Sequence, residues 1–135
     1  MREIRFICVH CTATPQTTTV ESIKRYWREN LKWSNVGYHR LIDASGKIHI
    51  LSEYAKPTNG VAGYNANSIH ISYIGGVNGK KAVDNRTPEQ KATMLDLLTE
   101  IKRLFPNAKI LGHRDFPNVK KACPSFDAIA EYKNL

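Results

Sequence analysis

Among the histidines and cysteines of this chain, His10, His113 and Cys123 together could supply the ligands of a metal ion. His113 and Cys123 stand ten positions apart in LGHRDFPNVKKACPSFD (111–127), which is typical of a loop, and His10 ends an apolar run near the N-terminus. A catalytic zinc site commonly takes three nitrogen or sulfur ligands from the protein and leaves the fourth position to water. The zinc-binding motif H-E-x-x-H is absent, so from spacing alone an ordinary core histidine and a buried cysteine remain an open alternative.

The elements that would position these side chains follow from the pattern of apolar residues. The segment 4–11, IRFICVHC, is almost continuously apolar, which is typical of a strand covered on both faces, and His10 lies near its carboxyl end. Thr18 and Glu21 form a capping-box signature for an amphipathic helix over 18–31. Because α/β sheets carry functional residues at and beyond the ends of their strands, the first strand predicts a site at its end.

The rest of the chain alternates between strands and helices. Thr87, Pro88 and Gln90 predict an N-cap, a first-turn proline and a capping-box partner for a long helix, and Ser125 is expected to cap a short last helix. The other segments are predicted to be a hairpin over 36–51 with its turn at 43–46, a long loop over 52–67, a strand over 68–76 and a short strand over 108–111. This order predicts a single domain, residues 1–135, of the α/β class with a central mixed β-sheet flanked by helices.

Length, charge and cysteine content restrict the classes of function. A chain of 135 residues with 41% hydrophobic residues suits one domain with its own core. No run approaches eighteen apolar residues and no secretion signal is visible, so we expect a protein without a transmembrane segment that is cytoplasmic as synthesised. Cys8 and Cys11 lie too close along one strand to bridge easily, which argues against a disulfide framework. The net charge of +8 favours a polyanionic partner such as nucleic acid or an anionic cell wall.

Five motifs in order resemble one protein family. FICVHCTAT, WSNVGYHRLIDASGKI, GYNANSIHISYIGG, LGHRDF and KACPSFD are similar to the motifs of the zinc-dependent N-acetylmuramoyl-L-alanine amidases of the phage T7 lysozyme type, which are related to the peptidoglycan recognition proteins. The resemblance extends from about residue 4 to residue 130. Five ordered motifs are far more specific than any one of them.

The resemblance implies a role for each residue of a site. It implies that Zn²⁺ is bound by His10, His113 and Cys123, in a surface groove at one edge of the sheet. It also implies that Tyr38 and Lys121 are catalytic. A lysine ammonium can stabilise the oxyanion formed in amide hydrolysis, whereas an unperturbed phenol is a poor base, so Tyr38 is expected to act through its hydrogen bond.

Two positions depart from the family pattern. Gly60 stands where the phage-type enzymes tend to have a histidine, and His70 replaces a usual glycine. These changes are expected to affect the substrate groove and not the metal. His39 is expected to point to the face opposite Tyr38 and to be structural or to support the site, and Asp115 is expected either to hold its loop or to orient a ligand.

The function implied by the resemblance is hydrolysis of the amide bond between N-acetylmuramic acid and L-alanine in bacterial peptidoglycan. Such a metallo-amidase would act on the cell wall after release or export. The alternative is a non-catalytic peptidoglycan-binding module of the same fold, but recognition proteins of that kind lack the cysteine ligand and this chain has Cys123. No specific nucleic-acid binding is expected, because the basic residues are spread through the chain and no nucleic-acid motif is present. We expect a monomer whose partner is peptidoglycan.

Overall fold

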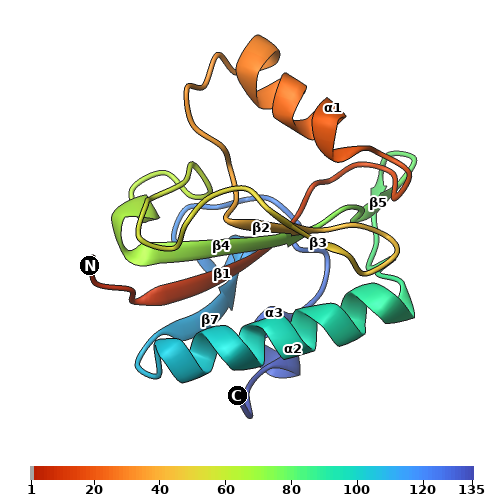
Figure 1. The fold of residues 1–135 in the computed structure, drawn as a ribbon. Coiled ribbons are helices and arrows are strands. Elements are labelled where there is room, and N and C mark those ends of the chain that lie inside the picture. The colour runs from red at the N-terminus through yellow and green to blue at the C-terminus, as the bar shows by residue number, and fades with distance from the viewer. Residues whose placement is uncertain (1) are drawn as a thin grey trace.

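A five-stranded mixed sheet forms the middle layer of the computed structural model, which describes residues 2–135 (Figure 1). The strand order is β3-β2-β4-β1-β7, in which β2, β4, β1 and β7 are parallel and β3 is antiparallel to β2. The strands are β1 (Phe6–Cys11), β2 (Arg40–Ile42), β3 (Ile48–Ile50), β4 (Ser68–Tyr73) and β7 (Lys109–Gly112). The two central strands, β1 and β4, are almost completely buried, which explains their nearly continuous apolar sequences. The predicted α/β class with a central mixed sheet is confirmed.

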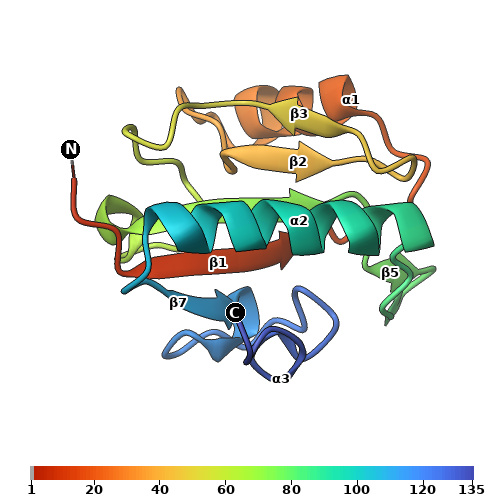
Figure 2. The ribbon, with the colours of Figure 1, turned by 60° about the horizontal axis from the view of Figure 1, so that its bottom comes forward.

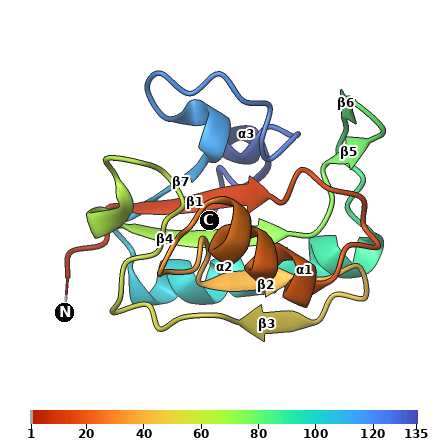
Figure 3. The ribbon, with the colours of Figure 1, turned by 90° about the horizontal axis from the view of Figure 1, so that it is seen from above.

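Helices cover both faces of this sheet. α1 (Val20–Arg25) continues into the π-helical turn η1 (Tyr26–Asn30) on one face, and α2 (Pro88–Leu104) crosses the other face, as Figures 1 and 3 show. α2 begins with the predicted capping box, in which the Thr87 hydroxyl accepts the Gln90 backbone N–H and the Gln90 side chain accepts the Thr87 N–H. The amide group of Gln90 also donates to the carbonyls of Ile42 and Ile74, which fixes the start of α2 against the ends of β2 and β4.

The alternation of side chains along β1 decides which face each residue serves. Ile7, Val9 and Cys11 belong to the main core between the sheet and α2, together with Met94 and Leu98 of that helix. Burial of each such side chain contributes roughly 1.5–3 kcal/mol, so this core fixes the rotation of the strand. The residues between them, Cys8 and His10, must then face the opposite side of the sheet, towards the loops that precede β4 and follow β7.

The short elements complete the fold. β5 (Val77–Asn78) and β6 (Lys81–Ala82) form a small hairpin, which sequence reasoning missed. There are also three short helices, η2 (Asn65–Asn67), η3 (His113–Asp115) and α3 (Ala128–Glu131). α3 lies beside β7 on the α2 side of the molecule (Figure 2). Within residues 2–135, no helix combines the length and the apolar character needed to cross a membrane.

Three boundaries predicted from sequence are wrong. The first helix begins at Val20 because Thr19, not Thr18, accepts the N–H of Ser22. Asp127, not Ser125, caps the last helix, because Ser125 has a φ of 71° and its hydroxyl donates to the Gly76 carbonyl. The strand expected over 68–76 ends at Tyr73, and two glycines with positive φ follow it.

Candidate metal centre

Three segments of the chain meet at the carboxyl ends of β1 and β7. His10 is the penultimate residue of β1, and His113 follows directly after β7, at the start of η3. β1 and β7 are parallel neighbours, and Val9 is paired with Gly112. The residues that follow this pair, His10 and His113, therefore bring their imidazoles to the same place. Cys123 reaches them from the loop before α3, and the nearest ligand atoms of His10, His113 and Cys123 all lie within 4.8 Å of one another.

The geometry of this group fits a tetrahedral zinc ion. Zinc–nitrogen distances of about 2.0–2.1 Å and a zinc–sulfur distance of about 2.3 Å put neighbouring ligand atoms roughly 3.3–3.8 Å apart. The Cys123 Sγ lies 3.9 Å from His10 Nδ1, and the ring centroids of His10 and His113 are 4.7 Å apart. The backbone N–H of Cys11 donates to the Cys123 Sγ over 3.1 Å, and this bond favours the thiolate form that binds metals.

The surroundings determine the protonation of the three side chains. Burial lowers the pKa of His10 well below its usual value, and the neighbouring His70, His113 and Lys121 act in the same direction. Burial, aided by Lys121, lowers the pKa of His113 to about 4. Both rings are therefore neutral at pH 7 and have a lone pair to offer a metal. The Cys11 thiol and burial raise the pKa of Cys123, so its thiolate depends on added positive charge such as a metal ion.

Tyr38 and Lys121 both stand next to this group. The ring of Tyr38 packs 5.0 Å from that of His10, and its hydroxyl donates to the Cys11 carbonyl over 3.3 Å. Burial, followed by the nearby Cys123 thiol, raises the pKa of Tyr38, so the phenol can donate a hydrogen bond but cannot serve as a base at neutral pH. Lys121 is exposed and lines the cleft beside His113.

Two clefts meet at His113 and Lys121. One contains His10 and Cys123 and runs beneath α1 and η1, and the other runs between the loops around residues 59–65 and 117–121. Both clefts are lined by Trp33, Asn59, Gly60, His113 and Lys121. In the described part of the chain, neither lining includes an aspartate or a glutamate. Hydrolysis of a glycosidic bond generally needs a pair of carboxylates, so the clefts do not suit that reaction.

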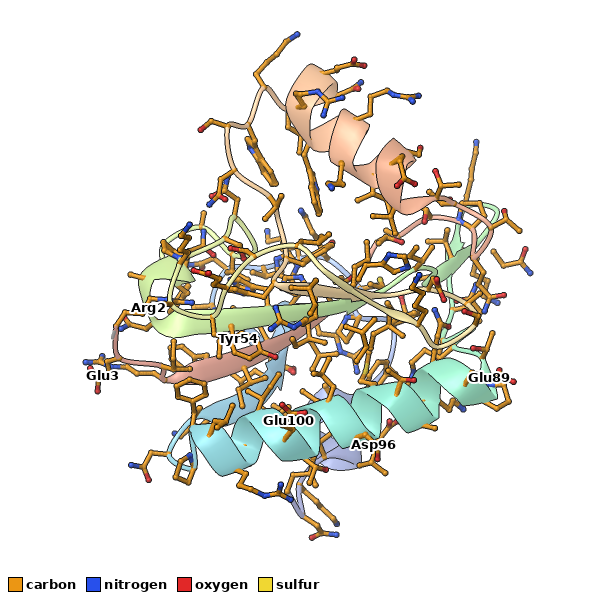
Figure 4. The ribbon with its side chains drawn as sticks, viewed as in Figure 1. Arg2, Glu3, Tyr54, Glu89, Asp96 and Glu100 are labelled. Carbon is orange, nitrogen blue, oxygen red and sulfur yellow. The ribbon has the colours of Figure 1, made fainter. Side chains whose placement is uncertain are left out.

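The acidic side chains of α2 lie far from these clefts. Figure 4 labels Glu89, Asp96 and Glu100 along α2, which covers the face of the sheet opposite α1. The same view shows Arg2 beside Tyr54, where the guanidinium donates to the Tyr54 carbonyl over 2.8 Å and ties the N-terminal segment to the loop after β3. The basic and aromatic character of the clefts is therefore a local property of the α1 side.

Two side chains from the sequence analysis have roles in holding the site. The Asp115 carboxylate accepts the Gly112 N–H over 2.8 Å, so it holds the turn that carries His113. His39 is buried; its Nδ1 accepts the backbone N–H of His70, and its Nε2 lies 2.7 Å from the Lys56 carbonyl. These bonds to two backbone segments give His39 a structural role.

Sequence reasoning missed His70 as a neighbour of the metal ligands. Its side chain is completely buried, and its Nδ1 lies 2.9 Å from His10 Nε2. The register between β1 and β4 pairs Cys8 with His70 and puts the imidazole on the same face as His10. The alternation of polar and apolar residues in SIHISY was the available signal: it puts His70 on the face opposite the isoleucines, but it does not show that His10 lies beside it.

Comparison with known proteins agrees with this geometry. A family model described as N-acetylmuramoyl-L-alanine amidase matches residues 1–126. The endolysin of Escherichia phage T7 is 35% identical over 124 residues, which are 90% of this chain and 80% of the phage protein. The solved structure of the Ph2119 endolysin from a Thermus scotoductus bacteriophage superposes with a TM-score of 0.80 at 22% identity, over 92% of this chain and 79% of that one.

The same fold occurs in a protein of another kind. Bumblebee PGRP-SA, a peptidoglycan recognition protein, superposes with a TM-score of 0.80 at 19% identity, over 99% of this chain and 83% of that one. At these identities, the two structural likenesses show a shared fold alone.

Proposed function

The chain belongs to the N-acetylmuramoyl-L-alanine amidase family and is an amidase that acts on peptidoglycan, and we propose that it does so with one zinc ion bound by His10, His113 and Cys123. The observation that carries the proposal is the meeting of two neutral imidazoles and one cysteine sulfur within 4.8 Å in a cleft. Zinc suits this mixed nitrogen and sulfur set better than magnesium or calcium, which prefer oxygen ligands.

Lys121 and Tyr38 are assigned separate roles beside the metal ion. When bound, zinc lowers the pKa of a coordinated water to about 7 and polarises the carbonyl of the scissile amide. Lys121 projects into the cleft, where its ammonium can face the carbonyl oxygen as negative charge develops there; such a donor contributes about 3 kcal/mol. Tyr38 stays protonated beside His10, so we assign it hydrogen-bond donation and not proton abstraction.

A peptidoglycan-binding module without catalysis is the second candidate, because the fold is shared with PGRP-SA. Cys123 supports the amidase instead. Two histidines alone would be an incomplete set for a catalytic zinc ion, whereas this chain presents a third ligand with a backbone N–H directed at its sulfur.

We also propose that the chain acts as a monomer that reaches the cell wall after release or export from the cytoplasm. Its net charge of +8 supports attraction to an anionic wall. Sedimentation at several protein concentrations tests the monomer, and retention on purified walls should weaken as salt rises.

Metal removal tests the proposed chemistry. We expect about one zinc per purified chain, release of new L-alanine amino termini from purified walls, loss of this release with a chelator, and recovery with added zinc. Mass spectrometry of the digest reports the bond that is cut. New reducing sugar ends without free alanine amines, or full hydrolysis by a metal-free chain, would contradict the proposal.

A further inference from the structure

Behind the metal centre, a row of hydrogen bonds leads from His10 into the protein. His10 Nε2 lies 2.9 Å from His70 Nδ1, and His70 Nε2 lies 2.8 Å from Asn65 Oδ1. His10 is 1% exposed and His70 is 0% exposed, so water does not compete for these bonds. We propose that His70 is a positioning residue that holds the His10 ring in the one tautomer and orientation that can bind a metal through Nδ1. The inference rests on the proposed zinc site.

One backbone group fixes the direction of every bond in the row. The Val61 N–H donates to Asn65 Oδ1 over 2.8 Å, and because an N–H can only donate, this Asn65 atom is an acceptor. The proton between His70 and Asn65 therefore sits on His70 Nε2, which leaves a lone pair on Nδ1 of the neutral ring. His10 must then donate from Nε2 to that lone pair. The lone pair of neutral His10 falls on Nδ1, the atom 3.9 Å from the Cys123 sulfur.

The His70 ring lies directly against the backbone of Gly60. A Cβ built on Gly60 would lie 2.2 Å from His70 Nδ1 and 2.3 Å from its Cγ, so the ring fills the space that any side chain at position 60 would need. Gly60 has no positive φ, so the close approach of the ring, and not the backbone conformation, requires glycine there. The two departures from the family pattern, Gly60 and His70, are therefore two halves of one arrangement. They are not two independent changes in the groove.

A second metal site is the rival explanation for the same side chains. Ligand atoms of Cys8, His10 and His70 also lie within 4.8 Å of one another. The 2.9 Å between the two nitrogens is a hydrogen-bond distance, and it is shorter than the roughly 3.3 Å expected between two nitrogen ligands of one tetrahedral zinc. The Asn65 acceptor also accounts for the other nitrogen of His70 without a metal. The hydrogen-bonded reading explains all four ring nitrogens, whereas the second site explains two.

Two substitutions of His70 separate positioning from simple filling of space. In His70→Asn, the side-chain oxygen can occupy the place of Nδ1 and still accept from His10. In His70→Gln, the amide reaches the place of Nε2 and the acceptor for His10 is lost. We expect competition with a chelator to show zinc affinity reduced about 10- to 100-fold in His70→Gln, the usual effect of losing such a partner, and reduced much less in His70→Asn. Thermal unfolding of both variants serves as the control for folding.

A measurement on the parent chain needs no variant. Nitrogen NMR of the metal-free protein should show His10 protonated on Nε2 and bare on Nδ1, and this result stands even if the proposed zinc chemistry fails. Equal losses of zinc affinity in the two variants, undiminished affinity in His70→Gln, or a His10 ring protonated on Nδ1 would each overturn the positioning role. Two zinc ions per parent chain would favour the second metal site instead.

Discussion

Two buried polar clusters lie on opposite faces of the sheet, and they differ in what they leave unpaired. On the α2 side, the Arg86 guanidinium donates to Asp84, Glu131 and Tyr132 and lies 3.5 Å from the ring centroid of Phe126. On the α1 side, the row of hydrogen bonds from Asn65 through His70 to His10 ends in ligand atoms that open into a cleft.

The difference shows where chemistry can occur in this fold. The Arg86 cluster is closed, because each charge meets an opposite charge or a hydrogen-bond acceptor, and it links the segment before α2 to α3. The histidine row is open at one end, where two neutral rings and a sulfur converge in a cleft. A closed cluster is expected to stabilise the fold, whereas the open end is expected to bind a cation. A substitution in one cluster should therefore leave the other cluster intact.

The largest effect is expected at the open end. Cys123→Ser should lose most of the bound zinc and reduce hydrolysis of cell walls by at least about 1000-fold, because a neutral hydroxyl is a far weaker zinc ligand than a thiolate. Metal analysis and wall turbidity measure the two effects. The unfolding of the metal-free variant should match that of the metal-free parent. A variant with full zinc and full activity would remove Cys123 from the ligand set.

The closed cluster should show the opposite pattern. Arg86→Met leaves Asp84 and Glu131 without their cation and should lower the free energy of unfolding by about 3 kcal/mol. Denaturant unfolding measures this loss, and the zinc affinity of the folded fraction should not change. Arg28→Met, which removes an exposed arginine of η1, is the matched control and should cost no more than about 0.5 kcal/mol. A large loss of zinc affinity in Arg86→Met would mean that the two clusters are coupled.

The contact between Gly60 and His70 can be tested within the open cluster. Gly60→Ala should lower the free energy of unfolding by about 2 kcal/mol, because the new methyl group overlaps the buried imidazole. In a His70→Ala background, the same change should cost much less, since the ring is gone. Equal costs in the two backgrounds would show that the ring does not occupy the space beside Gly60.

The smallest of these effects concerns Lys121. Lys121→Ala should slow hydrolysis by at least tenfold, or about 1.4 kcal/mol, while binding to walls stays close to that of the parent, because the ammonium acts on charge that develops only in the transition state. Cleavage rates and wall pull-down report these two quantities separately. Lys91→Ala, which removes the same charge from α2, is the control. Equal losses of binding and cleavage would make Lys121 a substrate-binding residue.

The sequence predicted the parts of this structure that depend on local pattern. Continuous apolar residues identified β1, and the capping box at Thr87 identified the start of α2. The first cap was misplaced by one residue, because Thr18 and Thr19 can cap equally well and only the hydrogen bond to Ser22 decides between them. Ser125 could not be excluded as a cap from sequence, since its positive φ belongs to a loop that packs against Gly76.

The candidate site was predictable only in part, for a related reason. His10, His113 and Cys123 stand in motifs that can be matched along the chain, so their meeting at one place was expected and is observed. The position of the His70 ring depends instead on the register between β1 and β4, two strands separated by more than fifty residues. The alternation in SIHISY puts His70 on the face opposite Ile69 and Ile71, but the pairing of His70 with Cys8, which brings the ring to His10, is a long-range contact that the local sequence does not show.

Anomalous X-ray diffraction from crystals of the zinc-loaded protein, recorded on both sides of the zinc absorption edge, tests the central claim most directly. We predict one anomalous peak per chain, about 2.0–2.1 Å from His10 Nδ1 and from a nitrogen of His113 and about 2.3 Å from the Cys123 Sγ. A chain without a peak, or with its peak between Cys8, His10 and His70, would contradict the account.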